Sequence, residues 1–590
     1  MSKIRIFALG GLGENGKNMY VVDVDKQYFI LDAGIKYPTS DLHGVDEIIP
    51  NYKMLIPIKD RIKGFFMSHA HEDHIGALPH MISELNVPIY ATNFTTQIIK
   101  DNFKESNLNL DDYTFNIISQ DSVIKFGNVQ VTFFNTTHSI PESVGIALHT
   151  LEGVIVYTSD YTFIQQSNDY YQTDFKKINE LANKHVLALL PESLGSGLPQ
   201  DSGVTQQLMH KINSVYANAE GRIIVSLFSS DLLKIQRVID VSLAHKKKIA
   251  IIGRRAQRIV DIAIENGYLH IPEESLVNLR YVDDKNKNDQ SDLVALVTGN
   301  RHEPFYMLQR MCKKIDRLIH INEKDSVLLM TSPVPGTEKM AARTLDVLSR
   351  SEANVTVIDK RLLSSSHASG EEIKMMINLL SPRYIIPTIG EFRHQYGVRS
   401  LAKELGYQEE NVFLLDNGDS FNFVKDKDAY VSKADIPNAG DILIDGTPVI
   451  DSNDQVMRDR ELLSEDGVIM VVANINPKTK KILGDPEVIS KGFVYVKEAE
   501  ELLTQVKAIF HETSKQYLSQ KYINWNDYKQ GLRESISKYL FQETKRRPIM
   551  IPVLISTEIY KVLINLFVRK DIENNTSTQH IFKAWKRYFI

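Results

Sequence analysis

The chain has 590 residues, more than one hydrophobic core usually organises, so we expect several domains. Hydrophobic residues make up 43% and charged residues 24%, which is a globular composition and excludes collagenous and wholly disordered proteins. The net charge of −5 gives no general attraction to nucleic acid, so any binding of RNA or DNA must come from local basic surfaces.

The chain contains one cysteine, Cys312, which excludes an internal disulfide framework and a cysteine-rich zinc module. A metal site would therefore use histidine and carboxylate ligands. The first residues, MSKIRIFALGG, lack the apolar core of a secretory signal, and no stretch approaches the roughly 20 apolar residues that span a bilayer. We expect a cytoplasmic protein with no membrane partner.

Taken in chain order, the hydrophobic pattern changes three times. Short apolar runs broken by Gly, Asn and Asp predict a strand-rich region over the first 160 residues. From about 205 to 360, strand-like and helix-like runs alternate, which predicts a parallel sheet with crossover helices. Polar and turn-forming residues from about 426 to 460 predict a connector, and the apolar runs beyond it predict a small terminal α/β unit.

The run from Ser68 to His74 follows the apolar segment GFFM and has the spacing H-x-H-x-D-H. Its side chains should lie where a strand ends and a loop turns them toward one point. By chance this spacing occurs on the order of once in a thousand such chains, so solvated surface histidines explain it poorly. Imidazole and carboxylate suit Zn or Mn, and four such ligands within six residues can serve two neighbouring ions. The run predicts a hydrolytic centre with one or two divalent ions.

Two further ligand candidates stand at other strand ends, His138 after VTFFNTT and Asp160 after VIVYTS. A lone histidine after a strand is more often a hydrogen-bonded loop residue. The joint order of the H-x-H-x-D-H run, a histidine and an aspartate favours one shared site, in which the carboxylate could bridge two ions. Asp32 in YFILDAG is a candidate anchor for a ligating imidazole, because such imidazoles usually donate their other N–H to a carboxylate.

These residues carry a resemblance to known proteins. HAHEDH, THS at His138 and SD at Asp160 are similar to the metallo-β-lactamase fold. The runs GGLGENGKNMY, GRIIVSLFSSDLLKIQ, SPVPGT, SSSHASGEE and MRDRELLSEDG resemble the ribonuclease J family of bacterial RNA-processing enzymes, and the resemblance covers residues 1 to about 556. It implies a metal-dependent ribonuclease that cuts RNA as a 5′-to-3′ exonuclease and as an endonuclease, in rRNA processing and mRNA decay.

The resemblance also implies the architecture. The fold class would be α/β, with a metallo-β-lactamase αββα sandwich, an inserted β-CASP α/β domain and a small C-terminal α/β domain. The expected segments are a metallo-β-lactamase domain in two parts (1–204 and 363–426), the β-CASP domain (205–362), a linker (427–460), a C-terminal dimerisation domain (461–556) and a tail of unknown role (557–590).

Site roles follow from the family pattern, position by position. The implied ligands are, for the first metal, His69, His71, His138 and Asp160, and for the second metal, Asp73, His74 and the bridging Asp160. Asp73 therefore also counts among the residues expected to be catalytic.

Outside the ligand set, the resemblance implies two more catalytic residues. Glu192 in LLPESLG matches an acidic motif, although a lone glutamate is also consistent with a surface carboxylate. His367 in SSSHASG matches a histidine motif and would stabilise the transition state or protonate the leaving 3′-oxygen. The expected substrate contacts are Ser230, Ser365 and Arg254.

The chain departs from the family pattern at three positions. Ile389 stands where the family usually has a histidine that completes the second metal site, which predicts weaker occupancy and slower turnover. Leu363 and Asp231 replace a histidine and an asparagine of the phosphate pocket. Lost donors, and a carboxylate that would repel phosphate, predict impaired recognition of a 5′-monophosphate.

Three functional readings follow. The first is a weakly active metal-dependent ribonuclease, similar to the less active of two family members in bacteria that carry two. The second is a largely non-catalytic subunit that supports a more active ribonuclease J paralogue, so the expected partners are RNA and a homodimer or a hetero-oligomer with that paralogue. The third is a different hydrolase on the same metal fold, and DNA-specific relatives also have an apolar residue at the final motif. The matches to ribonuclease J throughout the chain outweigh the third reading.

Overall fold

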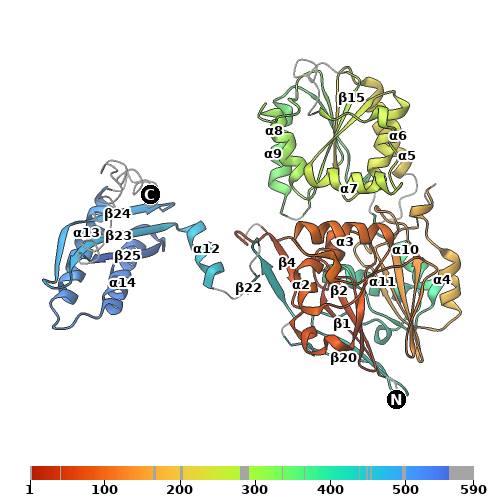
Figure 1. Cartoon of the computed structure of the whole chain (residues 1–590), viewed down its shortest axis with the longest axis horizontal. Helices are drawn as coiled ribbons and strands as arrows, with labels where there is room; N and C mark the ends of the chain where they lie inside the picture. Colours follow the sequence, from red (N-terminus) through yellow and green to blue (C-terminus); the bar gives the residue numbers. More distant parts are fainter. Residues whose placement is uncertain are drawn as a thin grey trace. The chain divides into compact units, whose positions relative to one another are not determined.

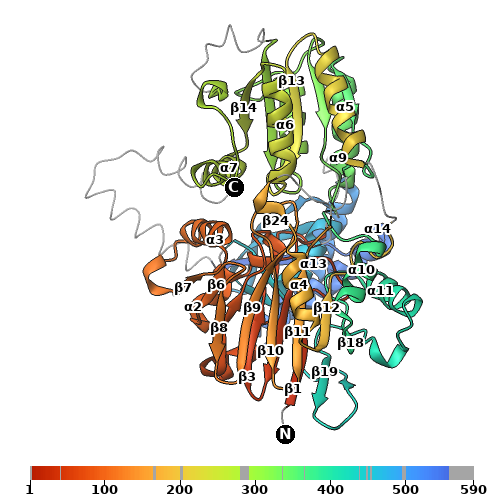
Figure 2. The ribbon, with the colours of Figure 1, turned by 90° about the vertical axis from the view of Figure 1, so that its right-hand side faces the viewer.

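The computed structural model describes residues 3–39, 42–163, 168–198, 204–279, 291–334, 336–363, 366–437, 439–446, 449–451, 455–493 and 500–556. The chain divides into two compact units, one made of residues 1–40 and 45–451 and the other of residues 41–44 and 452–590. Figures 1 and 2 show the ribbon of both units. Each unit is described by itself.

Two sheets form the centre of the first unit. The first sheet has the strand order β20 (Tyr430–Ser432), β19 (Ser420–Val424), β1 (Lys3–Gly10), β2 (Met19–Val24), β3 (Gln27–Leu31), β5 (Ile62–Phe66), β6 (Ile89–Ala91) and β7 (Phe115–Ile117). The second has the order β18 (Tyr384–Ile385), β12 (Val186–Pro191), β11 (Gly153–Ser159), β10 (Val144–Thr150), β9 (Val129–Asn135) and β8 (Val123–Phe126).

The side chains of these strands alternate between two apolar layers, as the period of a strand requires. In β1, Ile4 and Ile6 pack between the two sheets, whereas Phe7 faces helices α2 (Leu78–Leu85) and α3 (Asn93–Glu105). The outer face of the second sheet packs against α4 (Phe175–Ala182), α10 (Gly370–Leu380) and α11 (Phe392–Glu404) (Figure 1). This is the αββα sandwich that the resemblance implied.

A second domain is inserted into this unit. Its sheet is fully parallel, in the order β14 (Lys248–Ile252), β15 (Leu293–Gly299), β13 (Ile223–Phe228), β16 (Ser326–Leu329) and β17 (Asn354–Val357). Its helices are α5 (Val204–Asn218), α6 (Leu232–Ala244), α7 (Arg254–Glu265), α8 (Glu303–Cys312) and α9 (Glu338–Ser349). Figure 1 shows α5 and α6 on one face of the sheet and α8 and α9 on the other. The fold class predicted from the sequence is confirmed.

The segment expected to be a linker contains described strands. Besides β20, it contributes β21 (Asp441–Ile444) and β22 (Val449–Asp451), which form a small sheet with β4 (Glu47–Pro50) of the first unit. Helix α12 (Gln455–Glu465), by contrast, belongs to the second unit.

The second unit has its own apolar core. Strands β24 (Lys481–Lys491), β23 (Val468–Asn476) and β25 (Ile549–Ser556) form its sheet, and helices α13 (Glu500–Leu518) and α14 (Trp525–Thr544) pack on one face of it. The expected tail, residues 557–590, lies outside the described residues. Among the described helices, none is both long and apolar enough to cross a membrane.

Candidate metal centre

The ends of four strands bring the site together. The H-x-H-x-D-H run follows β5 of the first sheet and continues into the short helix α1 (Glu72–Ile75). His138, Asp160 and Glu192 follow β9, β11 and β12 of the second sheet. These strands are buried apolar runs, so their first polar residues lie at the edge of the sandwich, where they can converge.

The three imidazoles expected at the first metal converge on one point. His71 Nδ1 lies 3.0 Å from His69 Nε2 and 3.0 Å from His138 Nε2. Asp160 Oδ2 lies 3.6 Å from the same two Nε2 atoms. Tetrahedral zinc with bonds of about 2.0 to 2.1 Å to nitrogen separates its ligand atoms by roughly 3.3 to 3.4 Å. The donor set and its spacing therefore fit one such ion.

The ligands expected at the second metal share one oxygen with the first group. His74 Nε2 lies 3.3 Å from Asp160 Oδ2 and 3.6 Å from Asp73 Oδ2. Asp160 Oδ2 thus belongs to both groups, as a bridging carboxylate would. Asp160 Oδ1 is buried and accepts no hydrogen bond in the described structure, and His367 Nδ1 lies 3.5 Å from it.

Hydrogen bonds on the far side of each ring set which nitrogen faces the centre. His71 Nε2–H donates to the carbonyl of Ser230 (3.1 Å), and His138 Nδ1–H donates to the carbonyl of Ser366 (2.8 Å). His74 Nδ1–H donates to Asp32 Oδ2 (2.7 Å). In its neutral form, each ring therefore presents its unprotonated nitrogen to the ligand group, which is the form that binds a metal.

Asp32 accepts most of the hydrogen bonds that orient these rings. It follows β3 directly and has the anchoring role that the sequence predicted for it. Its Oδ2 also accepts from Tyr157 Oη (2.8 Å) and Ser68 Oγ (2.8 Å), and its Oδ1 accepts from the Ser68 N–H (2.8 Å). Ser68 Oγ in turn lies 3.0 Å from His69 Nδ1. One buried carboxylate thus orients His74 directly and His69 through Ser68. Sequence reasoning gave no role to Tyr157 or to Ser68, the first residue of the run, because neither side chain is charged or a typical metal ligand.

Burial and the neighbouring charges shift the pKa values of these groups. Burial lowers the pKa of His69, His71 and His138, so these rings stay neutral and available as ligands. Burial alone would also lower the pKa of His74, but Asp73, Asp160 and Asp32 together raise it well above its usual value. A divalent cation would take over the role of that proton.

Glu192 and His367 form a pair beside Asp160. Glu192 is fully buried, so the interpretation of a surface carboxylate is wrong for it. Its Oε2 lies 2.8 Å from His367 Nδ1, and its Oε1 accepts from the N–H groups of Tyr161 and Ala368. Burial raises the pKa of Glu192 to about 7. Burial opposes the charged form of His367, but Asp160 and Glu192 outweigh it and raise the pKa of that ring well above its usual value.

The expected substrate contacts are less completely described. The backbone carbonyl of Ser230 accepts from His71 Nε2–H. Sequence reasoning could not predict this contact, because it does not depend on the serine side chain. Ser365 and the side chain of Arg254 lie outside the described residues. Asp231 caps helix α6, accepts from the Lys234 N–H (3.0 Å) and pairs with the Lys234 ammonium, which offsets its charge. Leu363 is buried in an apolar cluster and offers no polar group.

Ile389 is buried where the sequence lacks the second-site histidine. Its φ of 53° is unusual for a β-branched residue, whereas histidine adopts this region more readily. Its N–H donates to Tyr20 Oη (2.9 Å), and Tyr20 Oη donates to Asn18 Oδ1 (3.1 Å). Asn18 Nδ2 lies 3.1 Å from His74 Nε2, the nitrogen expected to bind the second ion.

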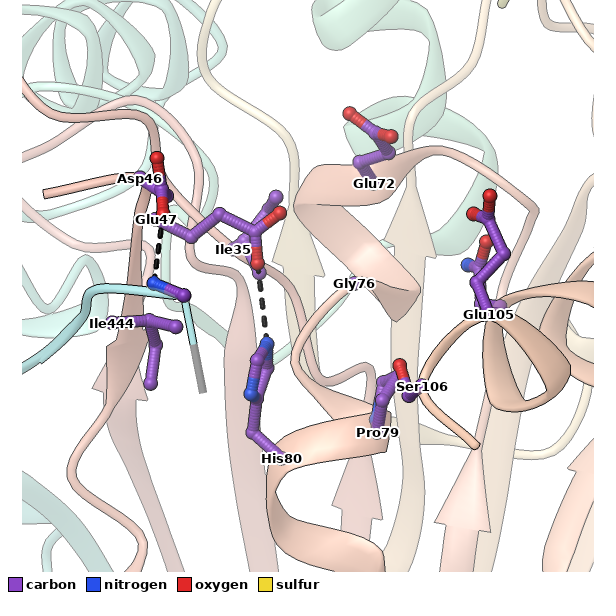
Figure 3. A pocket seen from close by; sticks show the side chains of 12 residues that line it. Ile35, Asp46, Glu47, Glu72, Gly76, Pro79, His80, Glu105, Ser106 and Ile444 are labelled. Atoms are coloured by element: carbon purple, nitrogen blue, oxygen red, sulfur yellow. Dashed lines mark hydrogen bonds and ion pairs between the residues drawn. The ribbon is translucent and has the colours of Figure 1, made fainter. Parts of the chain in front are cut away.

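A cavity of about 340 Å³ opens beside the metal-binding run (Figure 3). Its lining includes Asp46, Glu47, Glu72 and Glu105, and Glu47 pairs with His80 at 3.2 Å. This concentration of carboxylates would repel a phosphate backbone. The cavity is therefore a poor path for RNA.

Comparison with known proteins gives a consistent assignment along the chain. Four family models match it: "Beta-lactamase superfamily domain" at residues 40–187, "Ribonuclease J, beta-CASP domain" at 220–348, "Zn-dependent metallo-hydrolase RNA specificity domain" at 359–415 and "Ribonuclease J C-terminal domain" at 455–557.

Curated relatives match over almost their whole length. The chain is 38% identical to Ribonuclease J 2 of Staphylococcus aureus (strain NCTC 8325 / PS 47) over 551 residues, which cover 93% of this chain and 98% of the relative. It is 37% identical, with the same coverage, to Ribonuclease J 2 of Staphylococcus epidermidis (strain RP62A). A crystal structure of a protein of unknown function from Enterococcus faecalis V583 shares the fold, with a TM-score of 0.51, 15% identity and coverage of 71% of this chain and all of that one.

Proposed function

This chain belongs to the ribonuclease J family, and on that premise we propose that it is a metal-dependent ribonuclease with one well-built metal site and one weakened site. The convergence of His69 Nε2, His71 Nδ1, His138 Nε2 and Asp160 Oδ2 on one point carries the proposal. A divalent ion held there supplies positive charge at the scissile phosphate and makes a water molecule more acidic.

The chain's own residues have separate tasks in this reaction. Glu192 accepts from His367 Nδ1–H, so it orients the ring and stabilises its charged form. The raised pKa keeps both nitrogens of the His367 ring protonated at neutral pH, and the Nε2 proton can pass to the leaving 3′-oxygen, because Nδ1–H is held by Glu192. Asp160 is buried beside His367, with its Oδ1 3.5 Å from His367 Nδ1, so packing fixes the position of the carboxylate relative to the ring.

The second site is weakened for two reasons. Ile389 has no ligand atom, so the expected fourth donor is absent. In the neutral form of His74, which is the form that binds a metal, the lone pair of Nε2 can accept the N–H of Asn18 or bind an ion, but it cannot do both at once. The hydrogen bonds from Ile389 to Tyr20 and from Tyr20 to Asn18 hold the competing amide in place. We expect one tightly bound ion and one weakly bound ion per chain, of Zn or Mn.

A supporting role for a more active paralogue is the second candidate, and the sheet of the second unit favours it. Helices α13 and α14 cover one face. The strand register places Met470 opposite Ile551 on the open face. Three apolar side chains of this face are partly exposed to solvent: Ile551 (40%), Ile555 (36%) and Leu483 (43%). Such a face is suited to a C2 contact with a second copy or with a paralogue of the same fold.

The test is a cleavage assay on RNA and DNA that carry a 5′-monophosphate, a 5′-triphosphate or a 5′-hydroxyl, with Mn²⁺ or Zn²⁺ added. We expect metal-dependent cleavage of RNA at a low rate. The preference for a monophosphate should be small, because two polar groups of the family's phosphate pocket are replaced by Leu363 and by an Asp231 that is paired with Lys234. Charge-assisted hydrogen bonds worth roughly 1.5 to 3 kcal/mol each are thereby lost. A strong monophosphate preference would contradict this reading.

A further inference from the structure

Two neighbouring residues of the H-x-H-x-D-H run contact the β-CASP domain. His71 Nε2–H donates to the carbonyl of Ser230 (3.1 Å), and Glu72 Oε1 accepts from Asn300 Nδ2 (2.8 Å). Ser230 and Asn300 follow β13 and β15, which are adjacent parallel strands. The carboxyl ends of two strands in one domain therefore hold two consecutive residues of the other domain's metal-binding run.

The orientation of the Asn300 carboxamide is determined on both sides. The Glu72 carboxylate can only accept, so Asn300 Nδ2 must point to it, and Asn300 Oδ1 then accepts from Ser229 Oγ (2.7 Å). The other oxygen of Glu72 accepts from Tyr37 Oη. A chain of hydrogen bonds in which every donor has an acceptor thus connects the β-CASP strand ends with the side chain between two expected ligands.

Glu72 connects the contact with Asn300 to the two ligand candidates on either side of it. It is flanked by His71 and Asp73, and its backbone carbonyl accepts from the Ile35 N–H (3.0 Å), which fixes the start of α1. Its side chain points away from His80 in Figure 3. A shift of Glu72 would therefore move both flanking ligand candidates together.

We propose that Asn300 is a positioning residue: through Glu72 it holds the metal-binding run, so that the zinc affinity of the first site depends on contact with the β-CASP domain. This inference rests on the proposed function, which assigns the metal to His71. Because coupling is reciprocal, metal binding should in turn stabilise the contact between the two domains.

A contact that merely docks the domains would behave differently, and the chain offers one for comparison. Tyr268 of the β-CASP domain donates its hydroxyl to Glu142 Oε1 (2.7 Å), and its ring packs on Phe94. Neither partner adjoins an expected ligand. The same hydroxyl accepts from Asn93 Nδ2 (3.1 Å), so Tyr268→Phe removes two hydrogen bonds between the domains and keeps the ring, which makes it a stringent control.

The experiment measures zinc affinity by competition with a chromophoric chelator, on the full-length protein and without RNA. Asn300→Asp places a carboxylate against Glu72 and should weaken zinc binding about tenfold or more, the range typical of residues that orient metal ligands. Asn300→Ala removes the donor without adding charge and should weaken it in the same direction by less. Tyr268→Phe should stay within about twofold of the wild type.

A double variant exchanges the two groups and tests the mechanism itself. In Glu72→Gln with Asn300→Asp, the glutamine amide donates to the new carboxylate, while the Ser229 and Tyr37 hydroxyls keep their acceptors. Zinc affinity should return toward that of the wild type. Wild-type affinity in both Asn300 variants, or a double variant as weak as Asn300→Asp, would overturn the proposal.

The same assay separates this proposal from the one on which it rests. His71→Ala should lower zinc affinity whether or not Asn300 matters. If His71→Ala binds zinc as the wild type does, the metal site itself is misassigned. If only the Asn300 variants leave the affinity unchanged, the metal site stands and the positioning role is wrong.

Discussion

Asp32→Asn should damage the metal centre although Asp32 is not among its expected ligands. Four donor contacts converge on its two oxygens at 2.7 to 2.8 Å, from the Ser68 N–H, Ser68 Oγ, Tyr157 Oη and His74 Nδ1. Asparagine offers one oxygen and an NH₂ group, so in either orientation the NH₂ faces at least one buried donor. A buried unsatisfied donor costs about 1 to 3 kcal/mol, and the lost charge-assisted bond to His74 costs about 1.5 to 3 kcal/mol.

The substitution should therefore destabilise the fold by roughly 2.5 to 6 kcal/mol, a large share of a typical domain's stability. Because Asp32 also orients His69 through Ser68, zinc affinity should fall about tenfold or more. Thermal unfolding of the metal-free protein measures the first effect, and chelator competition measures the second. Asp174→Asn is the control, since Asp174 caps α4 and asparagine caps a helix equally well. If Asp32→Asn leaves both the stability and the zinc affinity unchanged, Asp32 does not orient His74 and His69 as described.

Two further predictions concern the weakened site and the second unit. Ile389→His should raise the metal content per chain or the cleavage rate, because the backbone at this position already has a conformation that histidine tolerates. Identical metal content and rate would show that a side chain at this position does not bind the metal. Ile551→Glu should dissociate a dimer formed through the open face of the second unit, as measured by light scattering. Lys538→Glu, at an exposed position of α14 on the covered side of the sheet, should not. A dimer that persists in Ile551→Glu would exclude this face as the interface.

The sequence predicted the class of fold and the residues that meet at the candidate centre. The fold class came from the family resemblance, whereas the ligand candidates rested on a local signal, since the H-x-H-x-D-H run, His138 and Asp160 each follow a buried strand. The residues that orient them were mostly missed. Asn300 lies 228 positions from Glu72, and Ser230 acts through a backbone carbonyl that every residue has. Neither contact has a sequence signature.

Two other features could not be predicted because tertiary packing decides them. The polar segment from 427 to 460 has the composition of a connector, yet β21 pairs with β4, almost 400 residues earlier in the chain. Glu192 was expected in the site only through its match to the family's acidic motif; the residue alone gave no sign that the sandwich buries it against His367 and two backbone N–H groups. Local polarity is a weak guide wherever a distant element supplies the partner.

The central claim is that this chain cleaves RNA with a metal held by His69, His71, His138 and Asp160. The most direct measurement is the cleavage of end-labelled RNA by purified wild type and His71→Ala, each stripped of metal with a chelator and then supplied with Mn²⁺ or Zn²⁺. We predict that the wild type loses cleavage on stripping and regains it with metal, and that His71→Ala stays inactive throughout. Equal cleavage by the two proteins, or cleavage by the stripped wild type, would contradict the claim.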